Sequence, residues 1–351
     1  MRVDADDPVV GDLLAGMLEV LAEAGGWLHP QARLTCRSGD LGVQCPADDG
    51  QPLARIPHAA MIPVGRLRWA STADALSFPD LPDGLDGAAI ELAYLQVALL
   101  NQCAKLSRLQ GEHPLLAPIS SGVIDAVRAF RPSFRTQPID PISLLWSTRC
   151  FRLRTRQGPA EPVVIPIVDL LDHHRGGASG IGTQDAFAVP VGRPRGDDAC
   201  LLDYGWQRDP IGMAVVYGFA DDSCDVAYSA PLRIDGPAGM IEVRGIGRDA
   251  NGRPAPMQAE VDGSLLRISH VGFGPACDPV AELMIASGSA RAHAQAVIEA
   301  VAIANRRLLG DLHDRAMTDP GAAATVLAGA ARHQQALIQT ILEPAQDGPL
   351  T

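Results

Sequence analysis

Apolar residues recur at helical spacing in the first part of the chain and at strand spacing directly after it. Residues 8–24 carry them on one helical face, and Gly25 and Gly26 follow, so a helix is predicted there. Three short runs between turn residues come next, at 32–36, 42–45 and 53–56. Such runs are typical of a small β-meander.

The middle of the chain mixes helical patterns with apolar runs. A polar stretch rich in proline, aspartate and glycine, residues 77–87, precedes a strong helical pattern at 88–109. Residues 162–169 form an unbroken apolar run of strand length, which predicts a buried strand. The other elements expected here are short helices at 122–130 and 141–150, a glycine-rich loop at 175–182, and strands at 186–191 and 199–203.

The last part of the chain changes from β to helical character. Residues 226–268 have mostly strand patterns with a hairpin turn at 249–252, and helices are predicted at 280–309 and 320–342. Strands and helices do not alternate regularly, so a doubly wound sheet is not expected. The predicted class is α+β: a β-rich domain, 1–225, with a helical insertion at about 77–150, and then 226–351, a β extension with a helical domain.

Composition narrows the range of functions. The chain has 351 residues, 47% of them hydrophobic, and a net charge of −12. A negative chain argues against nucleic-acid binding, which requires a basic surface; it suits a basic protein partner as well as plain solubility. No apolar run is long enough to span a membrane, and the acidic start does not resemble a signal peptide, so a cytoplasmic protein is expected.

Two residue types have unusual usage. Seven cysteines are scattered without a C-x-x-C pair, which favours neither a zinc cluster nor a disulfide framework. Lysine occurs once, as Lys105, against 28 arginines, a bias for which genome base composition is a sufficient cause.

Several motifs, in order, resemble those of SET-domain lysine methyltransferases of the Rubisco large-subunit type. An apolar run leads into Asp-Leu-Leu-Asp172-His173, similar to the Asp-Met-Leu-Asn-His-Ser of that family. Thirty residues later a glycine-acidic turn and a strand end at Tyr204 and Gly205, similar to its Tyr-Gly signature. Residues 211–219 resemble its helix ending in Tyr-Gly-Phe, and Arg149-Cys150-Phe151 resembles its Arg-Ala-Phe.

The resemblance implies a SET-type fold with a helical C-terminal substrate-binding domain, S-adenosylmethionine as cofactor, and methyl transfer to a lysine or similar amine of a protein or peptide. It assigns the catalytic role to Tyr204, whose hydroxyl would orient the amine and the methyl group. The cofactor-binding positions that it implies are Asp40, Leu41, Gly42, Arg149, Asp172 and His173. The acceptor channel would be lined by Trp206, Tyr217 and Phe219, for which core packing is an alternative.

Two positions depart from the family pattern. Asp172 stands where the family has asparagine, and Asp40-Leu41-Gly42 replaces Gly-x-Gly. An ionised aspartate only accepts hydrogen bonds, so it would attract the ammonium of the cofactor and repel its carboxylate. An alternative function is therefore a SET fold without methyl transfer, serving as a binding module or catalysing another reaction on a small molecule. No metal is expected, and the oligomeric state stays open.

Overall fold

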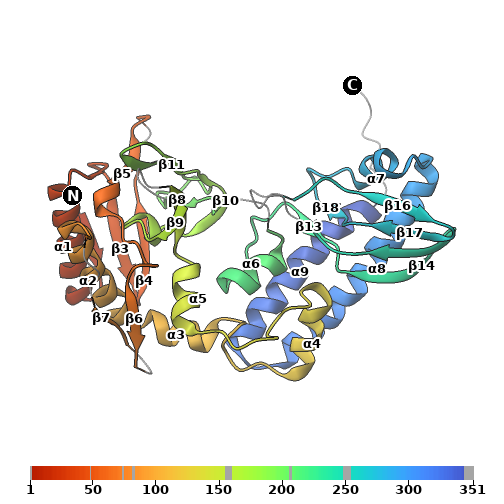
Figure 1. The fold of residues 1–351 in the computed structure, drawn as a ribbon, viewed down its shortest axis with the longest axis horizontal. Helices are drawn as coiled ribbons and strands as arrows, with labels where there is room; N and C mark the ends of the chain where they lie inside the picture. Colours follow the sequence, from red (N-terminus) through yellow and green to blue (C-terminus); the bar gives the residue numbers. More distant parts are fainter. Residues whose placement is uncertain are drawn as a thin grey trace. The chain divides into compact units, whose positions relative to one another are not determined.

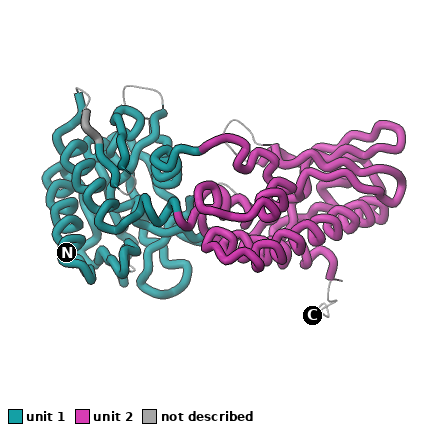
Figure 2. Tube along the Cα trace, turned by 90° about the horizontal axis from the view of Figure 1, so that it is seen from below, with its two compact units in different colours: residues 1–110, 139–205 teal, residues 111–138, 206–351 magenta. Residues whose placement is uncertain are grey.

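The computed structural model describes residues 2–47, 49–72, 75–80, 84–154, 160–204, 208–247 and 254–343. Contacts divide the chain into two compact units (Figure 2): unit 1 is residues 1–110 with 139–205, and unit 2 is residues 111–138 with 206–351. Each unit buries its own hydrophobic cluster. The predicted α+β class is confirmed, with helices inserted between strands and long helices at the C-terminal end (Figure 1).

The division between the units lies at residue 205 rather than at the predicted 225. Helix α6, Pro210–Tyr217, packs on the C-terminal helix α9, Ala322–Leu342, and so belongs to unit 2. The helical insertion is also divided, because residues 111–138, with α4 at Ser121–Phe130, pack on unit 2 helix α8.

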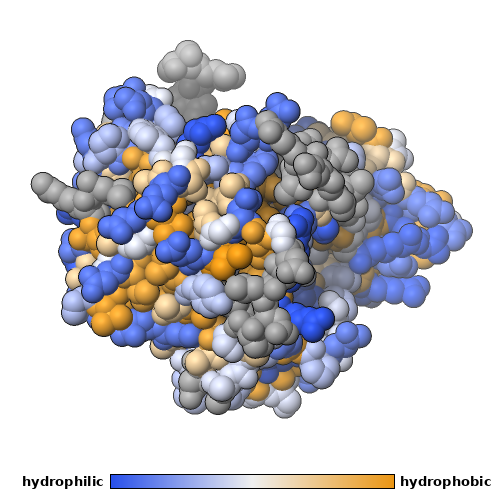
Figure 3. Space-filling view, turned by 60° about the vertical axis from the view of Figure 1, so that its left-hand side comes forward, coloured by the Kyte–Doolittle hydropathy of each residue, from blue (hydrophilic) through white to orange (hydrophobic). Residues whose placement is uncertain are grey.

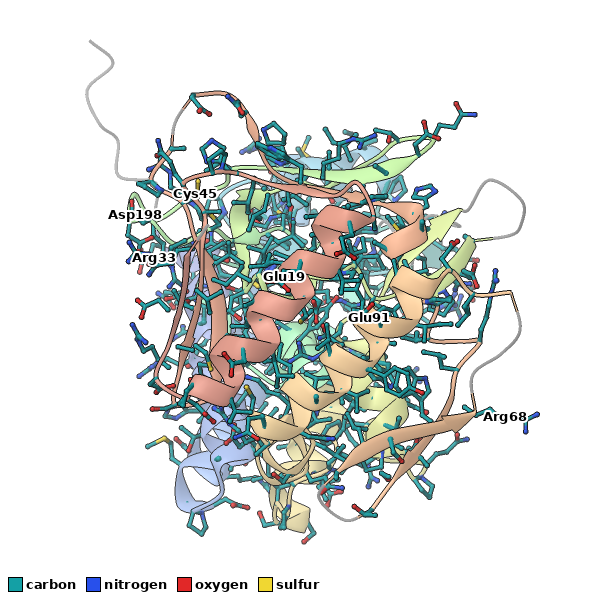
Figure 4. All side chains as sticks on the ribbon, turned by 90° about the vertical axis from the view of Figure 1, so that its left-hand side faces the viewer. Glu19, Arg33, Cys45, Arg68, Glu91 and Asp198 are labelled. Atoms are coloured by element: carbon teal, nitrogen blue, oxygen red, sulfur yellow. The ribbon has the colours of Figure 1, made fainter. Side chains whose placement is uncertain are left out.

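Unit 1 begins with strand β1, Arg2–Ala5, and helix α1, Pro8–Glu23. Asp7 caps this helix by accepting a hydrogen bond from Val9 N, and a proline follows at the first helical position. Buried Leu14, Met17 and Leu21 form its inner face, as the period predicted. In Figure 4, α1 lies beside α2, Gly87–Gln102, with Glu19 and Glu91 on their outer faces.

The predicted β-meander is wrong in its pairing. Strands β3, Arg33–Arg37, and β4, Asp40–Gln44, do pair, with β1 parallel to β3. Strand β5, Pro52–Pro57, instead joins a second sheet, in the order β11-β12-β5-β2. The other edge of β4 is occupied by a distant segment, because Cys45 N donates to Asp198 O and Cys200 N donates to Val43 O.

The remaining strands of unit 1 are short. The second sheet contains β2, Trp27–Leu28, β11, Ile181–Gly182, and β12, Ala186–Pro190. Unit 1 also contains strand β10, His173–Ala178, and two antiparallel pairs, namely β6, Arg68–Ser71, with β7, Leu76–Asp80, and β8, Phe151–Arg154, with β9, Ala160–Val163. A one-turn helix, η1, spans His58–Ala60, and α5 spans Pro141–Ser147, within the helix predicted at 141–150.

Two predicted elements of unit 1 are interrupted by positive φ angles. The helix expected at 88–109 is two helices, α2 and α3, Lys105–Glu112, because Ala104 has φ +50°. The buried run 162–169 is a strand only as far as Val163. It then turns through Ile167, at φ +71°, into the short helix η2, Val168–Leu170. Pro166 cannot donate to a strand ladder, which agrees with the end of pairing there.

Unit 2 combines two small sheets with helices. Strands β14, Leu232–Gly236, β15, Gly239–Val243, β17, Leu265–Ile268, and β16, Ala259–Asp262, form one sheet in that order. The short strands β13, Ala227–Tyr228, and β18, Gly272–Phe273, form the other. The turn predicted at 249–252 lies outside the described residues, apart from which the β character predicted for 226–268 is confirmed.

The C-terminal helices are α7, Pro279–Ser287, α8, Arg291–Thr318, and α9. The helix predicted at 280–309 is therefore two helices, since Gly288 ends α7 with φ +70°. Helix α9 agrees with the prediction at 320–342. In the described part of the chain, the helices lack the combination of length and apolar character needed to cross a membrane.

Apolar side chains also reach the surface of the molecule in places (Figure 3). On the described part of unit 1 the large apolar residues that are most exposed are Val9, Tyr94 and Ile181, on α1, α2 and β11. They lie on three different elements, and single exposed apolar residues need no partner to explain them.

Candidate functional site

A segment near the end of unit 1, residues 199–204, is held by backbone bonds on several sides. Leu202 forms single β-bridges with both His173 and Ala178, the first and last residues of β10, His173–Ala178. Leu202 N donates to Asp172 O at 2.9 Å, and Leu201 N donates to Gly192 O at 2.9 Å. The predicted strand at 199–203 is thus an extended segment enclosed by β10 and its neighbours rather than a member of a regular sheet.

The glycine-rich run at 175–182 is part of this enclosure and not a loop. It forms the end of β10 and all of β11. A Cβ atom at Gly177 would lie 2.8 Å from the backbone carbon and oxygen of Leu201. Only glycine permits this approach of two backbones. The glycines from which a loop was predicted therefore allow close packing around residues 199–204.

The enclosure places Tyr204 beside His173. Their ring centroids are 4.9 Å apart, and Tyr204 N donates to His173 Nδ1 at 3.0 Å. The same Nδ1 also lies 3.2 Å from Leu202 O. The hydroxyl of Tyr204 donates to Leu171 O at 2.8 Å, which fixes its direction. The structure therefore brings together two residues that the sequence analysis selected, the expected catalytic tyrosine and a cofactor-binding histidine.

Several charged side chains lie within electrostatic range of Asp172, the residue just before β10; they are called the charge cluster below. Burial raises the pKa of the Asp172 carboxyl, as does the negative charge of Asp40, while the positive charges of Lys105, Arg149 and Arg195 oppose this rise. The side chain still has an exposed surface. The predicted cofactor positions Asp40, Arg149 and Asp172 are thus close enough to act on one another electrostatically.

Asp40 reaches this cluster because the turn before it packs against Cys103, at the end of α2. Ser38 and Gly39 have φ +50° and +81°, and a Cβ atom at Gly39 would lie 3.3 Å from Cys103 O. The Asp40 carboxylate accepts a hydrogen bond from Arg108 Nη1 at 2.7 Å and lies 3.7 Å from Lys105 Nζ. Leu41 is buried and Gly42 pairs with Thr35, so the backbone of β4 carries these positions against η2.

Arg149 is held by the carboxylate of Asp169, the first residue of the Asp-Leu-Leu run. Asp169 in η2 is fully buried, and its Oδ2 lies 3.5 Å from Arg149 Nη1 and accepts a hydrogen bond from Gln96 Nε2 at 2.7 Å. Burial raises the pKa of Asp169 to about 6, against the effect of the Arg149 charge. Gln96 Oε1, Asp169 Oδ1 and Arg149 Nε are buried without hydrogen-bond partners.

Four residues of this cluster were missed as functional residues: Gln96, Lys105, Arg108 and Asp169. Lys105 carried one signal, since it is the only lysine of the chain. Asp169 carried another, because it begins the Asp-Leu-Leu run on which the resemblance depends. Nothing in the sequence connects Gln96 or Arg108, on α2 and α3, with η2 and β4, because such a connection is visible only once the chain is folded.

Two of the residues expected to line an acceptor channel belong to unit 2 rather than to unit 1. Tyr217 and Phe219 belong to unit 2, where their ring centroids are 6.2 Å apart and the Arg208 guanidinium lies 5.5 Å from the Tyr217 ring. Trp206 and Gly205 lie outside the described residues. The channel therefore stays a prediction.

Unit 1 also has an apolar pocket of about 470 Å³ on the side of α5. Its walls include Trp69 and Trp146, whose ring centroids are 4.3 Å apart, and Cys150, the neighbour of Arg149. Asp140 and Ser143 also contribute to its lining. A pocket of this size and lining can take an apolar side chain or a small organic molecule.

Taken together, the charge cluster contains both signs in one small region. The carboxylates of Asp40 and Asp172 can attract an ammonium group, and the cations of Lys105 and Arg149 can attract a carboxylate. A ligand with an α-amino-acid end carries both groups on one carbon atom. The two aspartates that departed from the family pattern are thus accompanied by cations, which removes the electrostatic objection to such a ligand.

No protein-family model matches the sequence, and no curated protein matches it. Solved structures do match. The chain is similar to SET-domain methyltransferases. One match is the SET domain of LSMT bound to lysine and AdoHcy, with a TM-score of 0.42 and 10% identity over 94% of this chain and 90% of that one.

A second match is Rubisco LSMT bound to sinefungin and monomethyllysine, with a TM-score of 0.46 and 11% identity at the same coverage. A third is Rubisco LSMT bound to AdoMet, with a TM-score of 0.42 and 10% identity. These solved structures are of enzymes of the kind that the sequence motifs resemble.

Proposed function

We propose that this chain is an S-adenosylmethionine-dependent N-methyltransferase that acts on a lysine, or a similar amine, of a protein or peptide. The observation that supports it most is the mixed charge cluster, in which Asp40 and Asp172 lie with Lys105 and Arg149 next to the His173–Tyr204 pair. The solved structures named above are of methyltransferases bound to AdoMet, AdoHcy or sinefungin.

The residues of the cluster fit the amino-acid end of S-adenosylmethionine. Asp172 and Asp40 would hold its ammonium, and Arg149, kept in place by Asp169, would hold its carboxylate. His173 and the segment 199–204 would contribute main-chain and ring contacts. When bound, S-adenosylmethionine supplies an electrophilic methyl group on a sulfonium.

Tyr204 is proposed as the catalytic residue. Its hydroxyl proton is directed at Leu171 O, so the hydroxyl oxygen acts as an acceptor. An acceptor oxygen can orient the N–H bonds of the incoming amine. The amine must be neutral to attack, while a free lysine has a pKa of about 10.4. Burial of the side chain in the site would lower that pKa and release the proton to water.

The net charge of the chain, −12, favours a basic acceptor. A lysine-bearing protein or peptide meets this requirement, and a small amine is a further candidate. The apolar pocket lined by Cys150 would bind a side chain of the acceptor next to the methylated residue.

Two measurements test the proposal together. The purified protein is titrated with S-adenosylmethionine and S-adenosylhomocysteine by calorimetry, and is then incubated with labelled S-adenosylmethionine and a panel of lysine-containing peptides and free lysine. Micromolar binding followed by label transfer to an amine is the expected result.

Absence of binding of both compounds by a folded sample would overturn the proposal. It would favour the alternative, in which the fold serves as a binding module or performs another reaction on a small molecule. Binding without transfer to any peptide would leave donor recognition in place and contradict the proposed acceptor class.

A further inference from the structure

The single lysine of the chain lies inside the charge cluster. Every other long basic side chain is one of 28 arginines. Lys105 is the first residue of α3 and directly follows Ala104, whose φ of +50° costs a non-glycine residue conformational energy. Only 16% of the Lys105 side chain is exposed, whereas lysines usually extend into solvent.

The Lys105 ammonium is poorly satisfied by the protein. Among the described residues it forms no hydrogen bond, and its one ion pair is to Asp40 Oδ1 at 3.7 Å. That carboxylate is 68% exposed and already accepts the closer bond from Arg108. Three donors on a mostly buried ammonium therefore lack close acceptors.

The neighbouring cations differ from Lys105 in this respect. Arg108 donates to Asp40, and Arg149 lies against both the carboxylate and the backbone oxygen of Asp169. Burial and the like charges of Arg149 and Arg108 lower the pKa of Lys105. The ammonium is thus held beside other cations at an energetic cost that an additional anion would offset.

We propose that Lys105 Nζ binds the carboxylate of the donor's amino-acid end, together with Arg149, while Asp172 receives the ammonium of that end. This rests on the proposed function and adds a residue that neither the motifs nor the comparisons identify. Lys105 lies 3.7 Å from Asp40 and close enough to Asp172 and Arg149 for their charges to act on one another, so both anchoring signs are present around it.

A purely structural role explains these observations less well. An ion pair to an exposed carboxylate at 3.7 Å contributes little to stability. No hydrogen bond to the described residues would offset the free-energy cost of removing the Lys105 ammonium from water. Lysine also suits a tight space better than arginine, because its ammonium is a compact charge rather than a planar fork.

The test compares two ligands on three proteins by calorimetry. S-adenosylhomocysteine carries the complete amino-acid end, and 5′-methylthioadenosine lacks it. The proteins are the wild type, Lys105→Met, which keeps the length of the side chain, and Arg66→Met, which removes a cation of unit 1 that is paired with Glu161 outside the cluster. Thermal unfolding shows whether the variants fold.

We expect Lys105→Met to weaken S-adenosylhomocysteine binding by roughly ten- to a hundredfold, the loss typical of one charge-assisted hydrogen bond. Binding of 5′-methylthioadenosine should change less than threefold, and Arg66→Met should bind both ligands as the wild type does. Lys105→Arg should restore only part of the lost affinity.

Each other result has one meaning. Unchanged S-adenosylhomocysteine affinity in Lys105→Met would overturn the role of Lys105 and leave the proposed function intact. Equal losses for both ligands would also overturn it, because they indicate a general distortion of the site. A wild-type protein that binds neither ligand would overturn the proposed function, and the role of Lys105 with it.

Discussion

The fully buried side-chain amides of the two units differ in their hydrogen bonding. In unit 2, Gln334 Oε1 accepts from Ile211 N and its Nε2 donates to Tyr228 O, at 3.1 Å each. Asn305 likewise accepts from Ala230 N and donates to Val301 O. Both amides are fully buried, and each uses its acceptor and its donor to join chain segments. They act as structural cross-links.

In unit 1, the buried amide Gln96 is bonded on one side only. Its Nε2 donates to Asp169, while its Oε1 has no partner, and neither do Asp169 Oδ1 and Arg149 Nε. Native proteins rarely leave buried polar atoms unpaired, and such atoms together call for an explanation. Unit 2 has such atoms too, namely Asp209 Oδ2, Arg306 Nε and Gln339 Oε1, but in unit 1 Gln96, Asp169 and Arg149 belong to one network of contacting side chains, which holds Arg149 in place.

A buried ion pair alone does not distinguish unit 1 from unit 2, because each unit contains one. Asp209 of unit 2 is also fully buried and is paired with Arg131. Its Oδ1 accepts from Gly212 N as well, so it caps helix α6, and Arg131 donates to Phe130 O. What separates Arg149 is its surroundings, since Asp172 and Lys105 lie within electrostatic reach of it.

The largest effect is expected from Tyr204→Phe, which removes the one hydroxyl proposed to act on the reacting groups. The rate of methyl transfer should fall by roughly a hundred- to a thousandfold, as when one preorganised hydrogen-bonding group is lost. Donor affinity should stay within about threefold of the wild type, since the charge cluster is untouched. Steady-state kinetics and calorimetry on the same samples check both numbers.

Tyr94→Phe is the matched control for that substitution, because it removes a hydroxyl from an exposed tyrosine of the same unit. It should leave both rate and affinity unchanged. A Tyr204→Phe variant with a wild-type rate would remove Tyr204 from the mechanism, whatever its effect on stability.

The next effect concerns the pH dependence of stability. Burial raises the pKa of Asp169 from 3.8 to about 6. Between these values the folded protein binds a proton that the unfolded chain does not, so protonation stabilises the fold. This contribution is complete below the unfolded pKa and is lost as pH rises through about 6, to a total of about 3 kcal/mol.

Asp169→Asn cannot titrate, so the difference in unfolding free energy between wild type and variant should change across pH 4 to 7. Urea denaturation at intervals of half a pH unit measures it. Asp319→Asn, in unit 2, is the contrast, because hydrogen bonds from Ser120 and Gly321 lower the pKa of that exposed aspartate. Its stabilising effect is present above its unfolded pKa and is lost as pH falls. A flat Asp169 difference would contradict the raised pKa.

Much of the architecture followed from the sequence because it depends on local patterns. Helices α1, α4 and α9 and strand β12 lie where they were predicted. The failures have one physical cause, a backbone conformation set by packing with distant residues. The positive φ of Ala104 and Ile167 breaks a helix and a strand whose patterns give no warning, and β5 pairs with β12 rather than with its neighbour β4.

The candidate site was predictable where a motif carries it. Asp172, His173 and Tyr204 were selected from their neighbours in sequence, and the structure brings His173 and Tyr204 together. Gln96 and Arg108 were not, because their contacts to Asp169 and Asp40 cross 73 and 68 residues. Electrostatic partners that come together only when the chain folds leave no pattern in a single sequence.

The smallest effect is expected from Gln334→Leu and Gln96→Leu, two substitutions that keep a similar side-chain volume. They test directly whether the buried amides of the two units have different roles. The first removes the hydrogen bonds that Gln334 forms with the buried Ile211 N and with Tyr228 O, and should lower the unfolding free energy by about 2 to 3 kcal/mol. The second removes an unpaired oxygen along with one bond to Asp169, so these terms partly cancel and the net loss should be about 1 kcal/mol or less.

Guanidinium denaturation of both variants measures the two losses, and calorimetry with S-adenosylhomocysteine measures the binding consequence. Gln96→Leu should weaken binding by a few-fold, because Asp169 then holds Arg149 less firmly, whereas Gln334→Leu should bind as the wild type does. If Gln96→Leu proves the more destabilising of the two and leaves binding unchanged, the unit 1 network is a structural cross-link like that of unit 2.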